Sequence, residues 1–225
     1  VESDHAERFE QEGPISSWRA LAERERPADL CDFAASREAP PDPDEEVHWA
    51  RAERLGGGAC LVPFDCVSLD LTRAAPSRFE RSSNGVATGA TVEAARLSAL
   101  CELVERDAVV EWRARGVIAC TSDAIDAGSV PFEWFAHWRE RVRAADAALR
   151  CYALPALAGS PVMLCEINDA VKEGTPYRAI WGSGCHPDPE IALFRAVSEA
   201  LQSRITTITG AREDLLPTAY SMPSN

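Results

Sequence analysis

Polar and apolar residues recur with the period of an α-helix from about Thr91 to Trp112. At roughly 100° per residue, four polar residues share an arc of about 100°; they are Ser98, Glu102, Glu105 and Arg106. The opposite side is apolar and carries Leu97, Leu100, Cys101, Val104 and Ala108. A lone Glu-x-x-Glu-Arg patch of this kind favours an ordinary amphipathic helix with its polar side in water.

A second long helix is predicted from Asp188 to about Ile205. Asp188 is a suitable N-cap, and Pro189 and Glu190 suit the first turn that follows it. The apolar side of this helix carries Ile191, Phe194, Ser198, Leu201 and Ile205. A separate polar group consists of Arg195, Glu199 and Gln202. Two long helices therefore each carry a polar patch beside an apolar side.

The rest of the pattern predicts shorter helices and several strands. Helices are expected over 18–24 and 131–149, and a strand over 59–71 in which Pro63 indicates an edge or a bulge. Residues 150–157 and 161–169 are typical of a β-hairpin around Gly159-Ser160, and 177–184 of one more strand. We therefore expect a mixed α/β (α+β) fold, with helices packed on an antiparallel-rich sheet.

Both ends of the sequence suggest a piece of a larger fold. Residues 1–12 are typical of the end of a helix that has no N-cap before Glu2 and is broken at Gly13-Pro14. Residues 40–46 predict an exposed, acidic, proline-rich loop. We expect one domain over 1–225 that is incomplete at both ends, with an uncovered surface where the missing parts would lie.

Composition and charge exclude several classes of protein. The 225 residues are 46% hydrophobic, which is enough for a normal core, and the formal net charge is −13. A polyanion of this kind does not bind nucleic acid or anionic membrane nonspecifically. The sequence has no apolar run of about 18 residues and no signal peptide. We expect a cytoplasmic protein without nucleic-acid or membrane partners.

The cysteines and histidines do not indicate a metal site. The eight cysteines include no Cys-x-x-Cys pair, several of them lie in apolar segments, and the four histidines are scattered. Buried thiols in a reducing compartment are the better interpretation. The adjacent Cys185 and His186 have no obvious partner, so we interpret them as structural.

A polar loop precedes the first long helix and is a candidate for binding phosphate. Ser83-Asn84-Gly85 and Gly89 would let the main chain approach an anion, Thr91 is a plausible N-cap, and Glu93 suits the first turn. Neither a P-loop nor a Gly-x-Gly-x-x-Gly pattern is present. Taken alone, this loop is a weak signal.

Carboxylates on three helices suggest a cation site. The segment VESDHA at 1–6 is similar to VERDAV at 104–109, so that Glu2 corresponds to Glu105. If Glu2, Glu102 and Glu105 face Glu199 and Gln202, their oxygens are ligands suited to Mg²⁺ and its attached phosphates. Without a cation, their mutual repulsion should raise the pKa of at least one of them.

Two long segments resemble the YcaO family. SSNGVATGATVEAARLSALCELVERDA is similar to the family signature, in which a Ser-Asn-Gly turn precedes a helix with Ser-x-x-x-Glu-x-x-Glu-Arg. GSGCHPDPEIALFRAVSEALQSRITTITGAREDL is similar to the family's later helix, with Glu-x-x-Gln-x-Arg. The resemblance covers nearly the whole chain and is closest over 81–115 and 182–215.

The resemblance implies ATP-dependent activation of a peptide backbone amide, which yields a thioamide or an azoline, with ATP and Mg²⁺ as cofactors. It implies a magnesium site made by Glu2, Glu102 and Glu105. It implies nucleotide contacts from Ser83, Asn84, Gly85, Glu93, Ser98, Glu199 and Gln202. It implies charge neutralisation during phosphoryl transfer by the guanidinium groups of Arg106, Arg195 and Arg204.

The resemblance also implies partners. The segment VESDHAER is similar to the version of the first motif found in members paired with a TfuA-like protein, which favours thioamide formation. The expected partners are thus a peptide or protein substrate, a TfuA-like protein and, in a homodimer, a second copy of the chain.

Two other interpretations stay open at this point. The family's Gly-Lys-Gly stretch and Pro-rich tail are not found in this sequence, and its second motif is poorly kept around Ala90, Glu93 and Leu97. These departures favour a catalytically inactive peptide-docking module. The other alternative is a globular domain whose glutamates are simply solvated.

Overall fold

The computed structural model describes residues 12–33, 42–68, 79–116, 123–156, 159–169 and 179–209. The chain divides into two compact units, Val1–Val86 and Ala87–Asn225, and each is described by itself. The predicted helix end over 1–12, including Glu2, lies outside the described residues except for position 12. The single domain expected over 1–225 stays a prediction.

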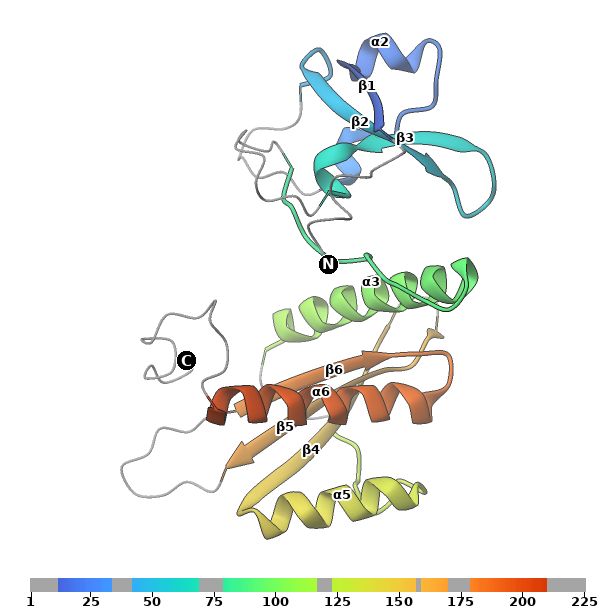
Figure 1. The fold of residues 1–225 in the computed structure, drawn as a ribbon. Coiled ribbons are helices and arrows are strands. Elements are labelled where there is room, and N and C mark those ends of the chain that lie inside the picture. The colour runs from blue at the N-terminus through green and yellow to red at the C-terminus, as the bar shows by residue number, and fades with distance from the viewer. Residues whose placement is uncertain are drawn as a thin grey trace. The chain divides into compact units, whose positions relative to one another are not determined.

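Unit 1 is built on a three-stranded antiparallel sheet (Figure 1). Its elements are β1 (Glu12–Ser17), α2 (Trp18–Ala22), the 3₁₀ turn η1 (Leu30–Asp32), β2 (Glu46–Glu53), β3 (Ala59–Pro63) and the 3₁₀ turn η2 (Phe64–Cys66). The core cluster of buried residues is Leu21, Leu30, Trp49, Leu61 and Phe79. The predicted strand over 59–71 ends at Pro63, on an edge of the sheet, and β1 and β2 were not predicted.

Unit 2 carries a second three-stranded antiparallel sheet with helices on both faces (Figure 1). Its elements are α3 (Val92–Ala114), α5 (Glu133–Ala144), β4 (Ala147–Leu154), β5 (Val162–Asp169), β6 (Ala179–Cys185) and α6 (Pro189–Thr209). The strand order is β4-β5-β6, so β6 lies at an edge. Side chains of α3 pack on one face of the sheet, and those of α5 and α6 on the other. The predicted mixed fold with antiparallel sheets is confirmed.

Both long helices begin where their N-caps predict. The Thr91 side chain accepts a hydrogen bond from the Ala94 N–H at 3.2 Å. At the start of α6, Asp188 Oδ1 accepts one from the Glu190 N–H at 2.9 Å. Each cap satisfies a main-chain donor that the first turn leaves without a helical partner. The predicted hairpin of β4 and β5 is also present, but the helix predicted over 131–149 extends only over Glu133–Ala144, and its last three predicted residues belong to β4.

The prediction of which side of α6 is buried was wrong. Ile191 and Phe194 are 41% and 44% exposed, whereas the buried side is a row of small residues with two larger ones: Ala192, Leu193, Ala196, Val197 and Ala200. The cause is the glycines of β6. A Cβ on Gly182 would lie within 3.0 Å of the main chain of Ala196 and Ala200, so strand and helix backbones are in direct contact.

The prediction for α3 was partly right: Cys101 and Ala108 of the predicted apolar side are buried and Val104 packs on the core. Leu97 and Leu100 are 43% and 40% exposed, while Glu105 is only 8% exposed and is buried together with Cys101, Ala108, Val109 and Trp112. Part of the polar patch therefore faces the sheet. None of the helices among the described residues is both long and apolar enough to cross a bilayer.

Candidate functional site

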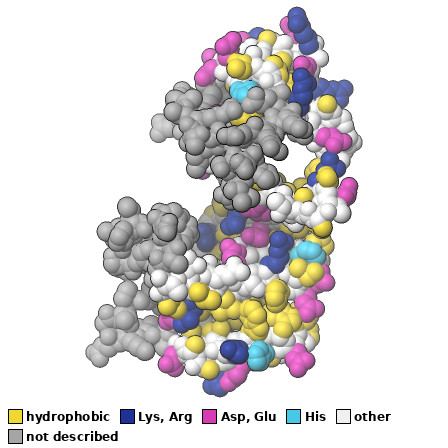
Figure 2. Space-filling view, viewed as in Figure 1, with side chains coloured by type: hydrophobic (Ala, Val, Ile, Leu, Met, Phe, Trp, Pro, Cys, Tyr) yellow, Lys and Arg dark blue, Asp and Glu magenta, His cyan; other side chains and the backbone are white. Residues whose placement is uncertain are grey.

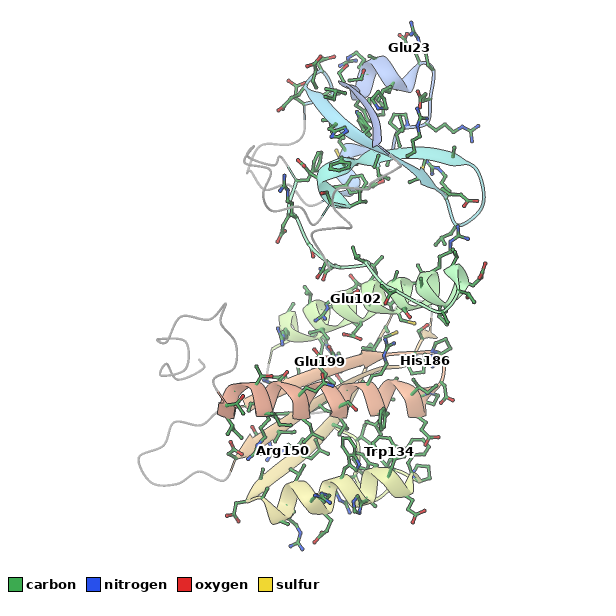
Figure 3. The ribbon with its side chains drawn as sticks, in the orientation of Figure 1. Glu23, Glu102, Trp134, Arg150, His186 and Glu199 are labelled. Carbon is green, nitrogen blue, oxygen red and sulfur yellow. The ribbon has the colours of Figure 1, made fainter. Side chains whose placement is uncertain are left out.

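A polar pocket of about 360 Å³ lies in unit 2, beside the edge strand β6. Its lining residues are Ala87, Ser98, Glu102, Glu105, Arg106, Ser183, Arg195, Ser198, Glu199 and Gln202. Figure 3 places Glu102 on α3 and Glu199 on α6. Acidic and basic side chains gather between these two helices on the face shown in Figure 2. The structure thus brings together seven of the residues predicted from the two helical motifs.

Two carboxylates meet at Ser183, in the middle of β6. The Ser183 hydroxyl donates to Glu105 Oε1 at 2.7 Å, and it lies 3.3 Å from Glu199 Oε2. The main-chain N–H of Ser183 donates to Glu199 Oε2 at 2.8 Å. Glu105 belongs to α3 and Glu199 to α6, which pack on opposite faces of the sheet. The two acids therefore reach the edge strand from both sides.

Burial dominates the electrostatics of Glu105. Removal from water raises the pKa of Glu105 above its ordinary value, and the charge of Glu199 acts in the same direction. The hydrogen bond from Ser183 and the charges of Arg106 and Arg195 lower that pKa again. Burial is thus the main cause of the raised pKa of Glu105, and the predicted repulsion among Glu2, Glu102 and Glu105 stays a prediction, because Glu2 lies outside the described residues.

Two predicted cations line the same pocket. Arg106 Nη2 lies 3.9 Å from Glu105 Oε1, and its side chain is 45% exposed, so this ion pair is loose. Arg195 Nη1 donates to the carbonyl oxygen of Cys185 at 3.1 Å, which holds its guanidinium beside β6. Guanidinium groups of this kind can pair with phosphate oxygens through several N–H donors at once.

Other predicted site residues lie elsewhere. Arg204 donates from Nε and Nη2 to Asp169 Oδ1 at 3.0 and 2.7 Å and lines a different pocket. Glu93 is exposed in the first turn of α3, where a main-chain hydrogen bond lowers its pKa. Glu2 lies outside the described residues.

The predicted turn at Ser83-Asn84-Gly85 is present in unit 1. The Val86 N–H donates to the Ser83 carbonyl oxygen at 2.9 Å, and Gly85 has a φ of 78°. A positive φ at the third position of a four-residue turn is the geometry that favours glycine. The turn is thus a local structure that these residues specify.

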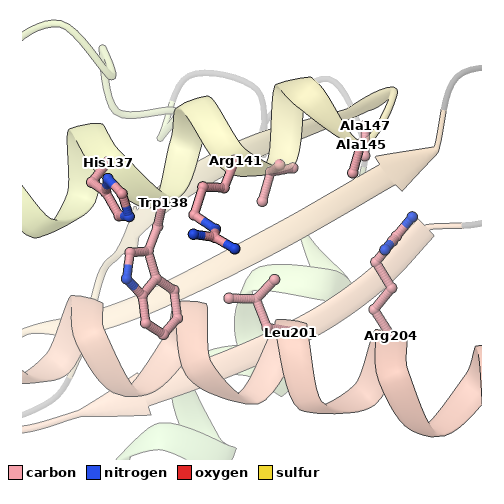
Figure 4. A pocket seen from close by; sticks show the side chains of 8 residues that line it. His137, Trp138, Arg141, Ala145, Ala147, Leu201 and Arg204 are labelled. Atoms are coloured by element: carbon pink, nitrogen blue, oxygen red, sulfur yellow. The ribbon is translucent and has the colours of Figure 1, made fainter.

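The second pocket, of about 390 Å³, lies between α5 and α6 (Figure 4). Apart from His137, Arg141 and Arg204, its lining is apolar: Trp138, Val142, Ala145, Ala147 and Leu201. Among the described residues, no carboxylate is part of its lining. The pocket beside β6 is therefore the better candidate for chemistry that involves a metal ion and phosphate.

The donor set of the pocket beside β6 fits magnesium with a nucleotide. The described residues contain no group of three His, Cys, Asp or Glu side chains arranged to hold a metal ion by themselves. Mg²⁺ is commonly held by one or two carboxylates together with substrate phosphates and water, so a complete protein cage is not required. Glu102, Glu105 and Glu199 supply carboxylate oxygens beside two guanidinium groups.

Ser183 is a site residue that sequence reasoning missed, as are Ala87 and Ser198, the latter of which was assigned to the apolar side of its helix. The available signal was the alternation in Gly182-Ser183-Gly184, because successive side chains of a strand point to opposite faces. Two glycines on one face leave room for a helix backbone, and the serine between them then faces the other way.

Comparison with known proteins decides the family. A model described as YcaO cyclodehydratase, ATP- and Mg²⁺-binding, matches residues 1–224. The chain belongs to the YcaO family.

The chain is also similar to curated proteins that are themselves uncharacterized. The chain is 35% identical over 188 residues to an uncharacterized protein in the tfuA 3′ region of Rhizobium leguminosarum bv. trifolii, a match that covers 79% of the chain and 44% of that protein. It is 34% identical over 211 residues to an uncharacterized protein of Mycobacterium tuberculosis strain H37Rv, covering 90% and 46%. The YcaO chain thus spans less than half the length of these relatives.

Solved structures give the same fold. A heterocyclase in complex with substrate and cofactor matches with a TM-score of 0.66 and 27% identity, over 92% of this chain and 28% of that one. The heterocyclase TruD matches with a TM-score of 0.62 and 24% identity, over 93% and 31%. The YcaO fold of the chain is therefore found within proteins that are much longer.

Proposed function

We propose that this YcaO chain takes part in the ATP-dependent activation of a peptide backbone amide, through the pocket between α3, β6 and α6. The observation that carries the proposal is the meeting of the Glu105 and Glu199 carboxylates at Ser183, beside Arg106 and Arg195. The family description, ATP- and Mg²⁺-binding, and the resemblance to a heterocyclase with bound substrate and cofactor support it.

Glu102 and Glu105 would hold Mg²⁺, with Glu2 of the first motif as a further ligand. Ser98, Glu199 and Gln202 would bind the nucleotide, together with Glu93 and the Ser83, Asn84 and Gly85 turn. Bound MgATP would supply its γ-phosphoryl group to the amide oxygen after a nucleophile has added to the carbonyl carbon, with ADP as the leaving group, and the phosphorylated oxygen would then depart as phosphate. Arg106 and Arg195 would orient the phosphates and balance their charge, which is the main contribution that a protein makes to phosphoryl transfer. Arg204 would act with them only if its pairing with Asp169 is exchanged for a phosphate.

The finer assignments are also proposals. Similarity to a protein encoded in the tfuA 3′ region supports a TfuA-like partner and hence a thioamide product, whereas resemblance to heterocyclases supports an azoline. A peptide or protein is the substrate in either case, and a homodimer is the proposed assembly. Use of ATP and the free thiols of the described cysteines favour a cytoplasmic location.

Thermal melting of the full chain with and without MgATP tests the proposal. A ligand that binds the folded state stabilises it by about 2.7 kcal/mol at one hundred times its Kd, so the melting temperature of the wild type should rise. Glu102→Gln keeps the shape of the side chain and removes a charge, and it should abolish that rise. Glu111→Gln is the matched control, because Glu111 is an exposed residue of the same helix outside the pocket.

The outcome separates the alternatives. A rise that is lost in Glu102→Gln and kept in Glu111→Gln supports the nucleotide site. If the wild type melts at one temperature in both conditions, the ATP proposal fails. Binding of a peptide without any nucleotide dependence would then favour the docking module.

A further inference from the structure

The centre of the pocket is built by a strand whose two glycines let one helix, α6, approach its main chain closely. Gly182 and Gly184 face α6, where a Cβ on either would lie within 3.0 Å of the helix main chain. Ser183 lies between them and faces α3, so its hydroxyl reaches Glu105. The close approach of α6 to β6 also lets the Glu199 carboxylate reach the main-chain N–H of Ser183.

The need of edge strand β6 for hydrogen-bond acceptors does not by itself explain why two carboxylates converge on Ser183. The N–H groups on the open side of an edge strand need acceptors, and one side-chain oxygen from α6 would suffice. A glutamine at 199 would serve this purpose without adding a second charge beside Glu105. Instead, two acids converge on one buried serine, whose exposed fraction is 8%. Crowded carboxylates are costly without cations beside them, and the pocket of about 360 Å³ has room for a metal ion in addition to Arg106 and Arg195.

We propose that Ser183 is the positioning residue of this pocket: its hydroxyl holds Glu105 toward the magnesium ion, and its main-chain N–H holds Glu199 toward the nucleotide phosphates that the ion carries. The inference rests on the proposed function, since it assigns to Ser183 the placement of one ligand of the ion and of one group that binds the nucleotide. Ser183 itself touches neither the ion nor the nucleotide. It acts through Glu105 and Glu199, which lie 78 and 16 positions away from it in the chain.

Ser183→Ala tests the hydroxyl. Calorimetry at a fixed ATP concentration measures ATP binding to the full chain while Mg²⁺ is varied. The quantity compared is the Mg²⁺ concentration at which ATP binding is half-maximal. Hydrogen bonds to charged groups are among the stronger ones in proteins, so we expect the required Mg²⁺ concentration to rise about tenfold or more. Near-normal ATP affinity should return at saturating Mg²⁺. Ser183→Thr keeps a hydroxyl and should restore most of the magnesium response.

Ser129→Ala is the matched control. The Ser129 hydroxyl donates to the Asp126 carbonyl oxygen at 2.7 Å in an exposed segment that does not line the pocket. A purely structural role for Ser183 would lower the melting temperature of Ser183→Ala without moving its magnesium midpoint. Glu199→Gln gives an independent measurement should Ser183→Ala fail to fold, because glutamine still accepts the N–H hydrogen bond but lacks the charge.

The results are separable from those for the proposed function. A wild type that binds no MgATP overturns the proposed function and this inference with it. A wild type that binds MgATP, with unchanged magnesium midpoints in folded Ser183→Ala or in Glu199→Gln, overturns the positioning role alone. A shifted midpoint in Ser183→Ala that Ser183→Thr restores supports it.

Discussion

The close packing of α6 on β6 makes Gly182→Ala a sharp perturbation. The added methyl group would meet three main-chain atoms of Ala196 and Ala200 within 3.0 Å. Main-chain atoms of a helix cannot rotate away as a side-chain end can, so the helix has to move off the strand. Overpacking of a core commonly costs about 1–3 kcal/mol, and we expect about 3 kcal/mol here because backbone meets backbone.

The same change should also weaken the site. For a domain of this size, 1 kcal/mol corresponds to about 2–4 °C in melting temperature, so we expect a fall of roughly 6–12 °C. Glu199 moves with α6, so its hydrogen bond to the Ser183 N–H should be lost. Chemical and thermal unfolding, followed by circular dichroism, measure the stability loss.

Gly56→Ala is the control for this prediction. A Cβ on Gly56 has no neighbour within 4 Å, and the residue does not require a positive φ. Its replacement should change stability by less than about 1 kcal/mol. Equal melting temperatures for Gly182→Ala and Gly56→Ala would refute the argument that the glycine of β6 is needed for helix packing.

Two further predictions concern single groups of unit 2. Because burial raises the pKa of Glu105 above 4.5, the contribution of this carboxyl to stability is complete below its unfolded pKa and is lost as the pH rises through its folded pKa. In metal-free buffer the wild type should therefore lose stability relative to Glu105→Gln above about pH 4.5. Urea unfolding at a series of pH values measures the free energy of unfolding of both proteins. Parallel curves of this free energy against pH would contradict the prediction. Asp123→Ala should destabilise by about 1–3 kcal/mol, because Asp123 Oδ2 accepts from Trp112 Nε1 at 3.1 Å and from Arg115 Nη1 at 2.7 Å. Asp123→Asn, which keeps an acceptor, should lose less in the same denaturation assay.

Local signals in the sequence predicted the elements of unit 2 well. Caps at Thr91 and Asp188 marked the helix starts, and Gly159-Ser160 marked the hairpin. Each of these signals acts within a few residues, so the rest of the fold is not needed to interpret it. β1 and β2 of unit 1 were missed because Gly13-Pro14 and the acidic residues before β2 are more typical of loops.

The buried sides of the helices could not be predicted in the same way. Hydrophobic periodicity assigned Ile191 and Phe194 to the core, yet the structure buries the alanines of α6. The choice depends on Gly182 and Gly184, which belong to a different element and admit only small residues above them. A helix considered alone carries no information about the shape of the strand on which it packs.

The same dependence explains why the site was only partly predicted. Grouping residues by helix face brought Glu102, Glu105 and Arg106 together, and Arg195, Glu199 and Gln202 together, and these six residues do line one pocket. It also grouped Arg204 with them by motif, although Arg204 pairs with Asp169 at the end of β5. What joins the two helical groups is Ser183, on a strand whose glycines let α6 approach closely enough for Glu199 to reach it. The types of side chain in the pocket could therefore be predicted from the two helices. The geometry that joins their carboxylates depends on three residues of the edge strand.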